Sequence, residues 1–164
     1  MIILLKNKQT LQIDKFNFKC CIGKGGLSTN KKEGDKKTPK GIFKIGNLYF
    51  RKDRINKPKT SIKCIKINQN MGWCDDVKFP KKYNKLFKIK NKIKHEKLKR
   101  KDYKYDLLIP IKYNFNKPIP GLGSCIFIHL TKNFKPTAGC IALNKNDFLI
   151  MLKLIKKNTK IKIF

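Results

Sequence analysis

The sequence predicts a mainly β fold with one helix in its C-terminal region. Most apolar residues fall in short runs, several of them alternating with polar residues, and Gly- and Pro-containing polar segments separate these runs. Only one stretch, after Leu143, has apolar residues at helical spacing. With 164 residues, the chain corresponds to one domain over residues 1–164 and is long enough for a substantial core.

The first strands are predicted close to the N-terminus. Residues 2–5 and 10–13 flank a short polar connection and predict a hairpin, and the alternating residues 16–22 predict the next strand. The polar segment 23–41 is rich in glycine and lysine, but no Gly-Lys-Ser/Thr and no helix pattern follow it, so it is interpreted as a structural loop and not as a phosphate site. Thr38-Pro39 is predicted to form a tight turn before a strand at 42–45.

The middle of the chain is less regular. Residues 61–67 alternate and predict a strand, and the next motif, at 71–76, contains the only tryptophan, Trp73. This motif is either part of a ligand site or a packed turn. Asp75 and Asp76 are consecutive, so on a strand they point in opposite directions, which argues against a paired-carboxylate mechanism. The basic region 80–101 is weakly patterned and is interpreted as a loop with a short helix near His95.

Residues 107–111 predict a central strand, and residues 125–129 predict a buried strand with Cys125, Phe127 and His129 on one face. A turn of small residues, 137–140, then leads to a short apolar segment at 141–143.

The helix after Leu143 is predicted from its cap and its apolar stripe. Asn144 or Asn146 can cap it, with Asp147 in the first turn. Residues 161–164 predict the last strand. The apolar stripe and the basic residues expected in the last turn are Phe148, Met151, Leu152, Ile155, Lys156 and Lys157.

Cys140 and His129 are the candidate catalytic pair. A thiol is a weak nucleophile at neutral pH and needs a nearby base, and a Gly-Cys turn can free the sulfur and the adjacent N–H groups. Gly139 suits such a turn because a side chain there would crowd the attacked carbonyl. The alternative is that Cys140 is buried filler and that His129 is a structural residue, because spacing alone does not bring the two together.

The formal net charge of +31 favours an anionic partner. However, only Arg51, Arg54 and Arg100 among the 41 basic residues are arginines, and the lysines are spread along the chain, so base composition of the gene is an alternative explanation for the excess. No specific nucleic-acid binding is therefore expected.

The six cysteines include no C-x-x-C pair, which favours free thiols. No run is long enough to span a membrane, and the N-terminal apolar run is too short for an export signal, which predicts a cytoplasmic protein.

Several motifs in order resemble the L,D-transpeptidase catalytic domain family, the YkuD-type enzymes. The first pair is G-D-K-K-T-P-K-G-I-F-K-I at 34–45 and I-F-I-H-L … P-T-A-G-C-I-A-L at 126–143. The further motifs, typical of a narrower branch, are G-G-L-S-T-N-K-K-E-G-D-K-K-T-P-K-G (25–41), G-W-C-D-D (72–76), Y-N (83–84), H-E (95–96), Y-D (105–106) and G-x-G-S-x-I-F-I-H (121–129).

The resemblance implies a β-sandwich with one C-terminal-region helix and short helical decoration. It implies that Cys140 attacks a carbonyl between an L- and a D-residue of a peptidoglycan stem peptide, that His129 acts as base, and that an amine or water resolves the acyl-enzyme. It implies a place in the periplasm or cell envelope. No cofactor, no metal and a monomeric protein are further expectations. The residues proposed to bind substrate are Thr137, Trp73, Asp75, His95, Tyr105 and Asn114.

Two positions depart from the commoner family pattern: Ala138 stands where a His usually precedes Gly-Cys, and Ala142 stands where an Arg usually follows the Cys. Three alternatives stay open. The first is an L,D-carboxypeptidase in murein turnover. The second is a non-catalytic basic module that binds nucleic acid or an anionic polymer. The third is a metal site made of Cys74, His95, His129 and Cys140, whose spacing matches no standard zinc pattern.

Overall fold

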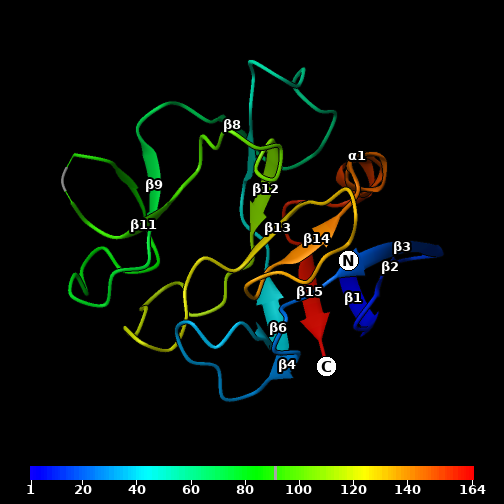
Figure 1. Ribbon diagram of the computed structural model, residues 1–164. Helices are drawn as coiled ribbons and strands as arrows, with labels where there is room; N and C mark the ends of the chain where they lie inside the picture. Colours follow the sequence, from blue (N-terminus) through cyan, green and yellow to red (C-terminus); the bar gives the residue numbers. More distant parts are fainter. Residues whose placement is uncertain (91) are drawn as a thin grey trace.

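The computed structural model describes residues 1–90 and 92–164, and it has a mainly β fold with a single helix among these residues (Figure 1). Residue 91, within the basic region 80–101, lies outside the described residues. The predicted fold class is confirmed.

Ten strands form the large sheet. The predicted hairpin at the N-terminus is confirmed, and the last strand of the chain runs parallel to the first, so both ends of the chain lie in the same sheet. In spatial order the strands are β6 (Gly41–Lys44), β15 (Lys160–Ile163), β1 (Ile2–Asn7), β2 (Thr10–Ile13), β3 (Phe16–Cys21), β14 (Ile141–Leu143), β13 (Phe127–Leu130), β12 (Leu107–Pro110), β7 (Leu48–Phe50) and β8 (Cys64–Lys66).

The large sheet curls until its first edge meets strand β12. Ile45, directly after β6, forms an antiparallel bridge with Ile111, directly after β12. Two further backbone bonds join the same segments, from the Lys112 N–H to the Lys44 carbonyl (2.8 Å) and from the Gly46 N–H to the Pro110 carbonyl (2.7 Å). The sheet therefore wraps around its own core.

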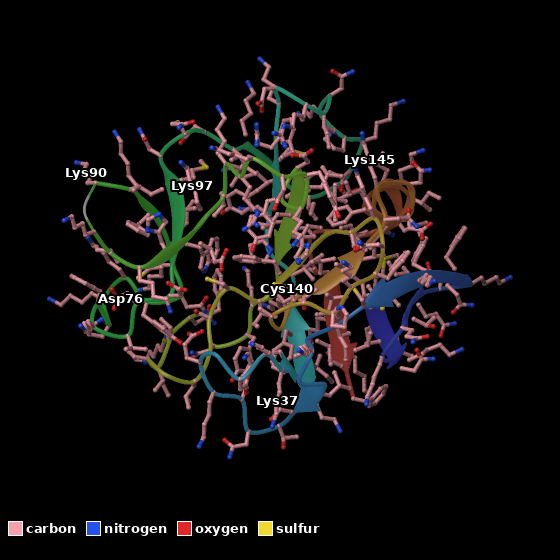
Figure 2. All side chains as sticks on the ribbon, in the orientation of Figure 1. Lys37, Asp76, Lys90, Lys97, Cys140 and Lys145 are labelled. Carbon is pink, nitrogen blue, oxygen red and sulfur yellow. The ribbon has the colours of Figure 1, made fainter. Side chains whose placement is uncertain are left out.

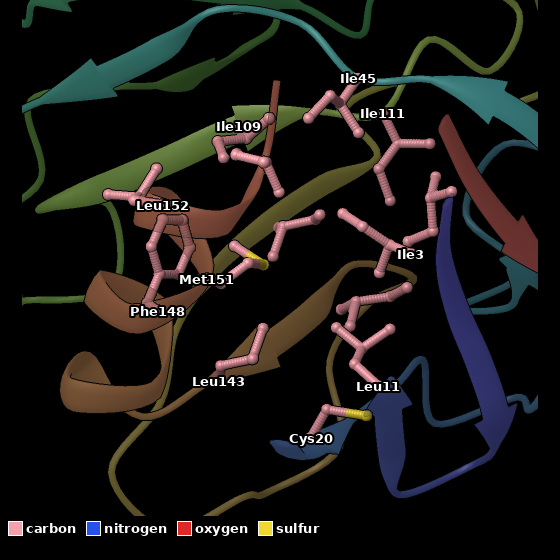
Figure 3. Close-up of a cluster of buried hydrophobic side chains, with 14 of the residues drawn as sticks. Ile3, Leu11, Cys20, Ile45, Ile109, Ile111, Leu143, Phe148, Met151 and Leu152 are labelled. Carbon is pink, nitrogen blue, oxygen red and sulfur yellow. The ribbon is translucent and has the colours of Figure 1, made fainter. Parts of the chain in front are cut away.

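The curled sheet and the helix enclose the main hydrophobic core (Figure 3). Alternation along β13 divides the side chains as predicted: Ile128 and Leu130 enter this core, whereas Phe127 joins a second cluster that also contains Cys140. Burying side chains of this size removes them from water at a gain of about 1.5–3 kcal/mol each. The candidate nucleophile thus lies next to a rigid, close-packed interior.

Helix α1 (Lys145–Leu154) packs against this core. Asn144 caps it, because its Oδ1 accepts from the Asp147 N–H at 2.9 Å. The predicted stripe of Phe148, Met151, Leu152 and Ile155 is fully buried. The helix ends before Lys156 and Lys157, so their predicted place in the last turn is wrong, and Lys153 is the basic residue there.

A separate three-stranded sheet contains β10 (Leu86–Lys88), β9 (Met71–Cys74) and β11 (His95–Lys97), in that order. The short helix predicted near His95 is therefore wrong. His95 pairs with Cys74 and Glu96 with Trp73 across the ladder, and this non-local pairing overrides a weak local pattern. In Figure 1 this sheet lies on one side of the molecule, away from α1.

The loop 23–41 contains a two-stranded parallel pair, β4 (Leu27–Ser28) and β5 (Thr38–Pro39). The predicted tight turn at Thr38-Pro39 is thus an extended segment, held by a bond from the Thr38 N–H to the Gly26 carbonyl (2.8 Å). The strand predicted over 61–67 is limited to β8, which pairs parallel with β7.

None of the helices formed by the described residues has the length and apolarity needed to cross a membrane.

Candidate active site

Cys140 ends the turn that leads directly into β14, and β14 runs parallel to β13, the strand that carries His129. The register pairs His129 with Ala142, only two residues after Cys140. Figure 2 shows Cys140 in the middle of the molecule, whereas Lys90 and Lys145 lie towards its periphery. The parallel pair β13–β14 is therefore what brings the predicted nucleophile and base into one region.

A cavity of about 520 Å³ opens over this region. Five of the residues predicted from the sequence line it, together with Ala138 and Ala142, the two positions that depart from the commoner family motif. The five are Asp75, Tyr105, His129, Thr137 and Cys140.

The Cys140 thiol is buried and protonated. Its Sγ lies 3.2 Å from the Cys125 carbonyl, to which the S–H donates, and it accepts from the Phe127 N–H at 3.4 Å. Burial raises the pKa of the thiol to about 12, although the Phe127 N–H opposes the shift. A thiol with so high a pKa needs a base before it can act as a nucleophile, because little resting thiolate is present at neutral pH.

His129 is neutral and has one nitrogen available. Its Nδ1 lies 2.9 Å from the Leu130 carbonyl, which can only accept, so the proton is on Nδ1 and Nε2 is left with its lone pair. Burial lowers the pKa of His129 to about 4. The edge-on ring of Tyr105 packs against the imidazole with the ring centroids 5.5 Å apart. None of the hydrogen bonds among the described residues joins His129 to Cys140.

Gly139 fits its position for two reasons. Its φ of 135° is disfavoured for residues with a side chain, and a Cβ would lie 2.9 Å from the Lys37 carbonyl oxygen. The Gly139 N–H donates to Thr137 Oγ1 (3.1 Å), whose hydroxyl in turn donates to the Cys140 carbonyl (2.6 Å). Thr137 therefore holds the turn itself, in addition to lining the cavity.

The N–H groups of Ala138 and Cys140 take part in none of the hydrogen bonds among the described residues. They remain available as donors, which is what an oxyanion hole requires. The Gly139 N–H already donates to Thr137 and is less available than these two.

Thr38 ties the distant upstream segment to this turn. Its Oγ1 donates to the Gly139 carbonyl (2.8 Å) and accepts from the Gly23 N–H (2.9 Å), and the residue is fully buried. Gly23 also bridges to Thr137. The Thr-Pro-x-Gly segment thus supports the turn that carries the candidate nucleophile, Cys140, through one hydroxyl.

Three residues predicted to bind substrate lie outside the cavity wall. Trp73 is buried, packs edge-to-face on Phe127, and donates through Nε1 to Asn84 Oδ1 (3.0 Å). His95 packs against Phe87 within the three-stranded sheet.

Asn114 spans its own loop, because its Nδ2 donates to the Ile119 and Gly123 carbonyls and its Oδ1 accepts from the Ile119 N–H. Trp73, His95 and Asn114 have structural contacts that explain them, and the cavity gives no support for direct substrate contact.

Sequence reasoning missed most of the charged wall of the cavity. Arg100 stacks over the Tyr105 ring at 4.9 Å and is held by Asp102, through Nη2, at 2.7 Å. Glu33 accepts hydrogen bonds from Tyr83 and Ser124. Glu33 lies within the motif at residues 25–41, and Arg100 lies shortly after the motif at 95–96. Only the folded chain shows that both residues line the same cavity as Cys140.

Each of the six cysteines has a free thiol. In the part of the chain that the structure describes, no three His, Cys, Asp or Glu side chains converge to hold a metal ion. The metal alternative built on Cys74, His95, His129 and Cys140 therefore has no geometric support.

Comparison with protein families gives a match over residues 1–163 to the L,D-transpeptidase catalytic domain, YkuD. Searches among curated proteins and among solved structures give no match. The family match covers nearly the whole chain and agrees with the mainly β fold and with the ordered motifs. The chain therefore belongs to the L,D-transpeptidase catalytic domain family.

Proposed function

We propose that the protein is a cysteine acyltransferase that acts on peptidoglycan stem peptides, with Cys140 as nucleophile and His129 as base. The observation that carries the proposal is the neutral pair in one cavity: a protonated Cys140 thiol, and a His129 imidazole whose Nε2 is free. Membership of a family that acts on peptidoglycan supports the substrate class.

In the first step His129 Nε2 takes the proton from Cys140 while Sγ forms a bond to the scissile carbonyl carbon. The carbonyl oxygen becomes an oxyanion, for which the Ala138 and Cys140 N–H groups are the available donors; such a donor is worth about 3 kcal/mol of barrier. The imidazolium then returns the proton to the leaving amine as the C–N bond breaks, which leaves a thioester on Cys140.

In the second step the amine of another stem peptide attacks the thioester, His129 accepts a proton from that amine, and the sulfur leaves to regain a proton as the free thiol. Water in place of the amine gives carboxypeptidase activity by the same steps. We propose transfer as the main reaction and hydrolysis as the alternative.

A purified muropeptide with a tetrapeptide stem tests the proposal. Wild-type protein is expected to release the terminal D-residue and to form a cross-linked dimer, both visible by mass spectrometry, and Cys140→Ala is expected to form neither. Release without dimer would assign the carboxypeptidase reaction, and products from Cys140→Ala at the wild-type rate would reject the proposed nucleophile.

We propose that this reaction takes place in the cell envelope, where peptidoglycan lies, with the basic surface favouring contact with acidic wall polymers. Fractionation of cells that express the tagged protein tests this: recovery only with cytosolic markers would contradict it.

A further inference from the structure

The chain has arginine at only three of its 41 basic positions, and all three arginines meet at one loop. This loop, residues 98–106, connects β11 to β12 and forms one wall of the cavity that contains Cys140. Arg100 belongs to the loop, whereas Arg51 and Arg54 reach it from the segment after β7 and do not line the cavity. The lysines are spread along the chain, so this convergence concerns the guanidinium group and not basic residues in general.

Arg51 and Arg54 hold the loop by its backbone. Arg51 Nη1 donates to the Arg100 carbonyl at 2.6 Å. Arg54 donates to the next two carbonyls, from Nη2 to Lys101 and from Nη1 to Asp102, both at 2.8 Å. These three consecutive carbonyls accept no other hydrogen bond among the described residues. The conformation of the loop therefore depends on the two guanidinium groups, because without them the carbonyls would lose their partners in the protein.

The two guanidinium groups are themselves fixed. Arg51 is buried, and its Nε and Nη2 donate to the two carboxylate oxygens of Asp53 at 2.8 and 2.6 Å. Arg54 Nη1 also pairs with Asp106, at the end of the loop, at 3.0 Å. A planar guanidinium serves several acceptors at fixed angles, whereas a lysine ammonium is a point charge on a flexible stem. Lysine could therefore not replace either arginine here without a loss of contacts.

The loop held in this way carries groups that surround His129. The Lys104 carbonyl accepts from the Leu130 N–H (3.0 Å), and the Leu130 carbonyl in turn holds His129 Nδ1. The Tyr105 ring packs against the imidazole, and Arg100 covers the Tyr105 ring. The loop therefore acts on His129 in two ways, through the backbone of β13 and through an aromatic side chain.

We infer that Arg51 and Arg54 are positioning residues that clamp the loop 98–106, so that the loop fixes the orientation of His129 and shields its imidazole from water. The inference rests on the proposed function for the role of His129 as base. Neither arginine lines the cavity, so both act through the loop. A loosened clamp admits water to the imidazole, and water favours the charged form of a buried histidine.

Arg54→Lys tests the clamp, because it keeps the charge and removes the guanidinium. The chain has only two histidines, so NMR can follow each imidazole through a pH titration, and the signal that is lost in His95→Gln identifies His95. In the wild type the pKa of His129 is about 4, lowered from 6.5 chiefly by burial. In Arg54→Lys we expect this pKa to rise by about one pH unit or more. We also expect acylation of Cys140 by a carbapenem to slow about tenfold or more, because the base is less well placed.

Lys101→Gln is the matched control, because it removes an exposed cation from the same loop and leaves the guanidinium groups in place. Its titration and its acylation rate are expected to stay close to those of the wild type. The charged groups that act on His129 are unaltered in both variants: Lys104 and Arg100 disfavour the imidazolium, and Asp102 favours it.

Circular dichroism checks that each variant is folded. If Arg54→Lys is not, Asp106→Asn replaces it, since it removes the carboxylate that pairs with Arg54, and it is expected to raise the pKa of His129 as well.

An unchanged titration of His129 in folded Arg54→Lys would overturn the inference. An equal shift in Lys101→Gln would also overturn it, because the effect would then come from charge and not from the contacts of the guanidinium. A raised pKa with an unchanged acylation rate would reject the positioning role. If the wild type itself is not acylated, the proposed function fails, while the titration still decides whether the clamp holds His129.

Discussion

At the scale of single residues, the candidate pair is neutral at rest. Burial pushes the two pKa values apart, upwards for Cys140 and downwards for His129, and both shifts disfavour the charged form. Simple alkylation is therefore a poor measure of Cys140, because an alkylating reagent needs preformed thiolate. A reagent that presents a carbonyl, so that His129 can act during attack, is the appropriate probe.

The buried neutral His129 has a consequence for acid stability. Its folded-state pKa of about 4 lies below the ordinary value of 6.5, so between these values the unfolded chain binds more protons than the folded one. The stability that depends on a neutral His129 is fully present above pH 6.5 and is lost as the pH falls towards 4. From pH 7 to pH 4.5 we expect the free energy of unfolding to fall by about 2–3 kcal/mol through this group.

Urea unfolding of wild type and His129→Gln at both pH values measures this term. The variant is expected to be less stable at pH 7 but to lose less stability on acidification, by the amount that His129 contributes. An equal loss in the two proteins would show that His129 is not held neutral by the fold.

At the scale of elements, Thr38 joins three segments that are far apart in sequence. Its hydroxyl links the end of the β3 connection, at Gly23, to the turn before β14, at Gly139, while its own backbone lies in β5. Because the site is fully buried, each of the two backbone groups would be left unpaired without the hydroxyl.

Thr38→Val keeps the shape and removes both hydrogen bonds. We expect the free energy of unfolding to fall by about 2–4 kcal/mol and acylation of Cys140 to slow by about 10²-fold, because the nucleophile turn loses its support. Thr38→Ser is the matched control: it keeps the hydroxyl and loses one methyl group, at about 1 kcal/mol. Equal acylation rates in the two variants would contradict the supporting role of the hydroxyl.

Elements with strong local signals were predictable from the sequence. The hairpin β1–β2 follows from two apolar runs around a short polar connection, and α1 follows from the Asn144 cap and a four-residue apolar stripe. The strand β11 was not predictable, because His95–Lys97 has no alternating pattern and is extended only by pairing with β9. Thr38-Pro39 was predicted to be a turn but is extended, because it pairs with β4, which lies ten residues earlier in the chain.

 

The residues of the candidate site also fall into two groups, those that could be predicted from the sequence and those that could not. Cys140, His129 and Gly139 could be predicted because a single stretch of sequence carries all three. Glu33 and Arg100 could not, because each is far from that stretch in sequence and reaches the cavity only through the fold. Trp73 was predicted to bind substrate partly because it is the only tryptophan, but a single tryptophan is as often a core residue, and Trp73 is buried.

At the scale of the whole molecule, the excess of positive charge is the dominant feature. The chain has 41 basic and ten acidic residues, and side chains such as those of Lys90, Lys97 and Lys145, which are labelled in Figure 2, are exposed. Like charges at this density repel one another and disfavour the compact state. The fold therefore carries an electrostatic cost that salt can screen.

Raising NaCl from about 10 mM to about 150 mM shortens the Debye length from about 30 Å to about 8 Å. We expect the protein to gain about 1 kcal/mol or more in stability and its Tm to rise by about 2–4 °C for each kcal/mol. Thermal unfolding followed by circular dichroism measures this, with an equal osmolarity of sucrose as the control for solvent exclusion. A Tm that falls with NaCl would show that attractive ion pairs outweigh the repulsion.

The central claim is that Cys140 is the acylated nucleophile and that His129 serves it as base. Intact-protein mass spectrometry after exposure to a carbapenem tests it most directly, with peptide mapping to locate the adduct among the six cysteines. The wild type is expected to gain one adduct on Cys140, as is Cys64→Ser, which removes a thiol on β8 that does not line the cavity. Cys140→Ala is expected to gain none, and His129→Ala to react about 10²-fold or more slowly. Adducts on Cys140→Ala at the wild-type rate, or a His129→Ala variant as fast as the wild type, would contradict the account.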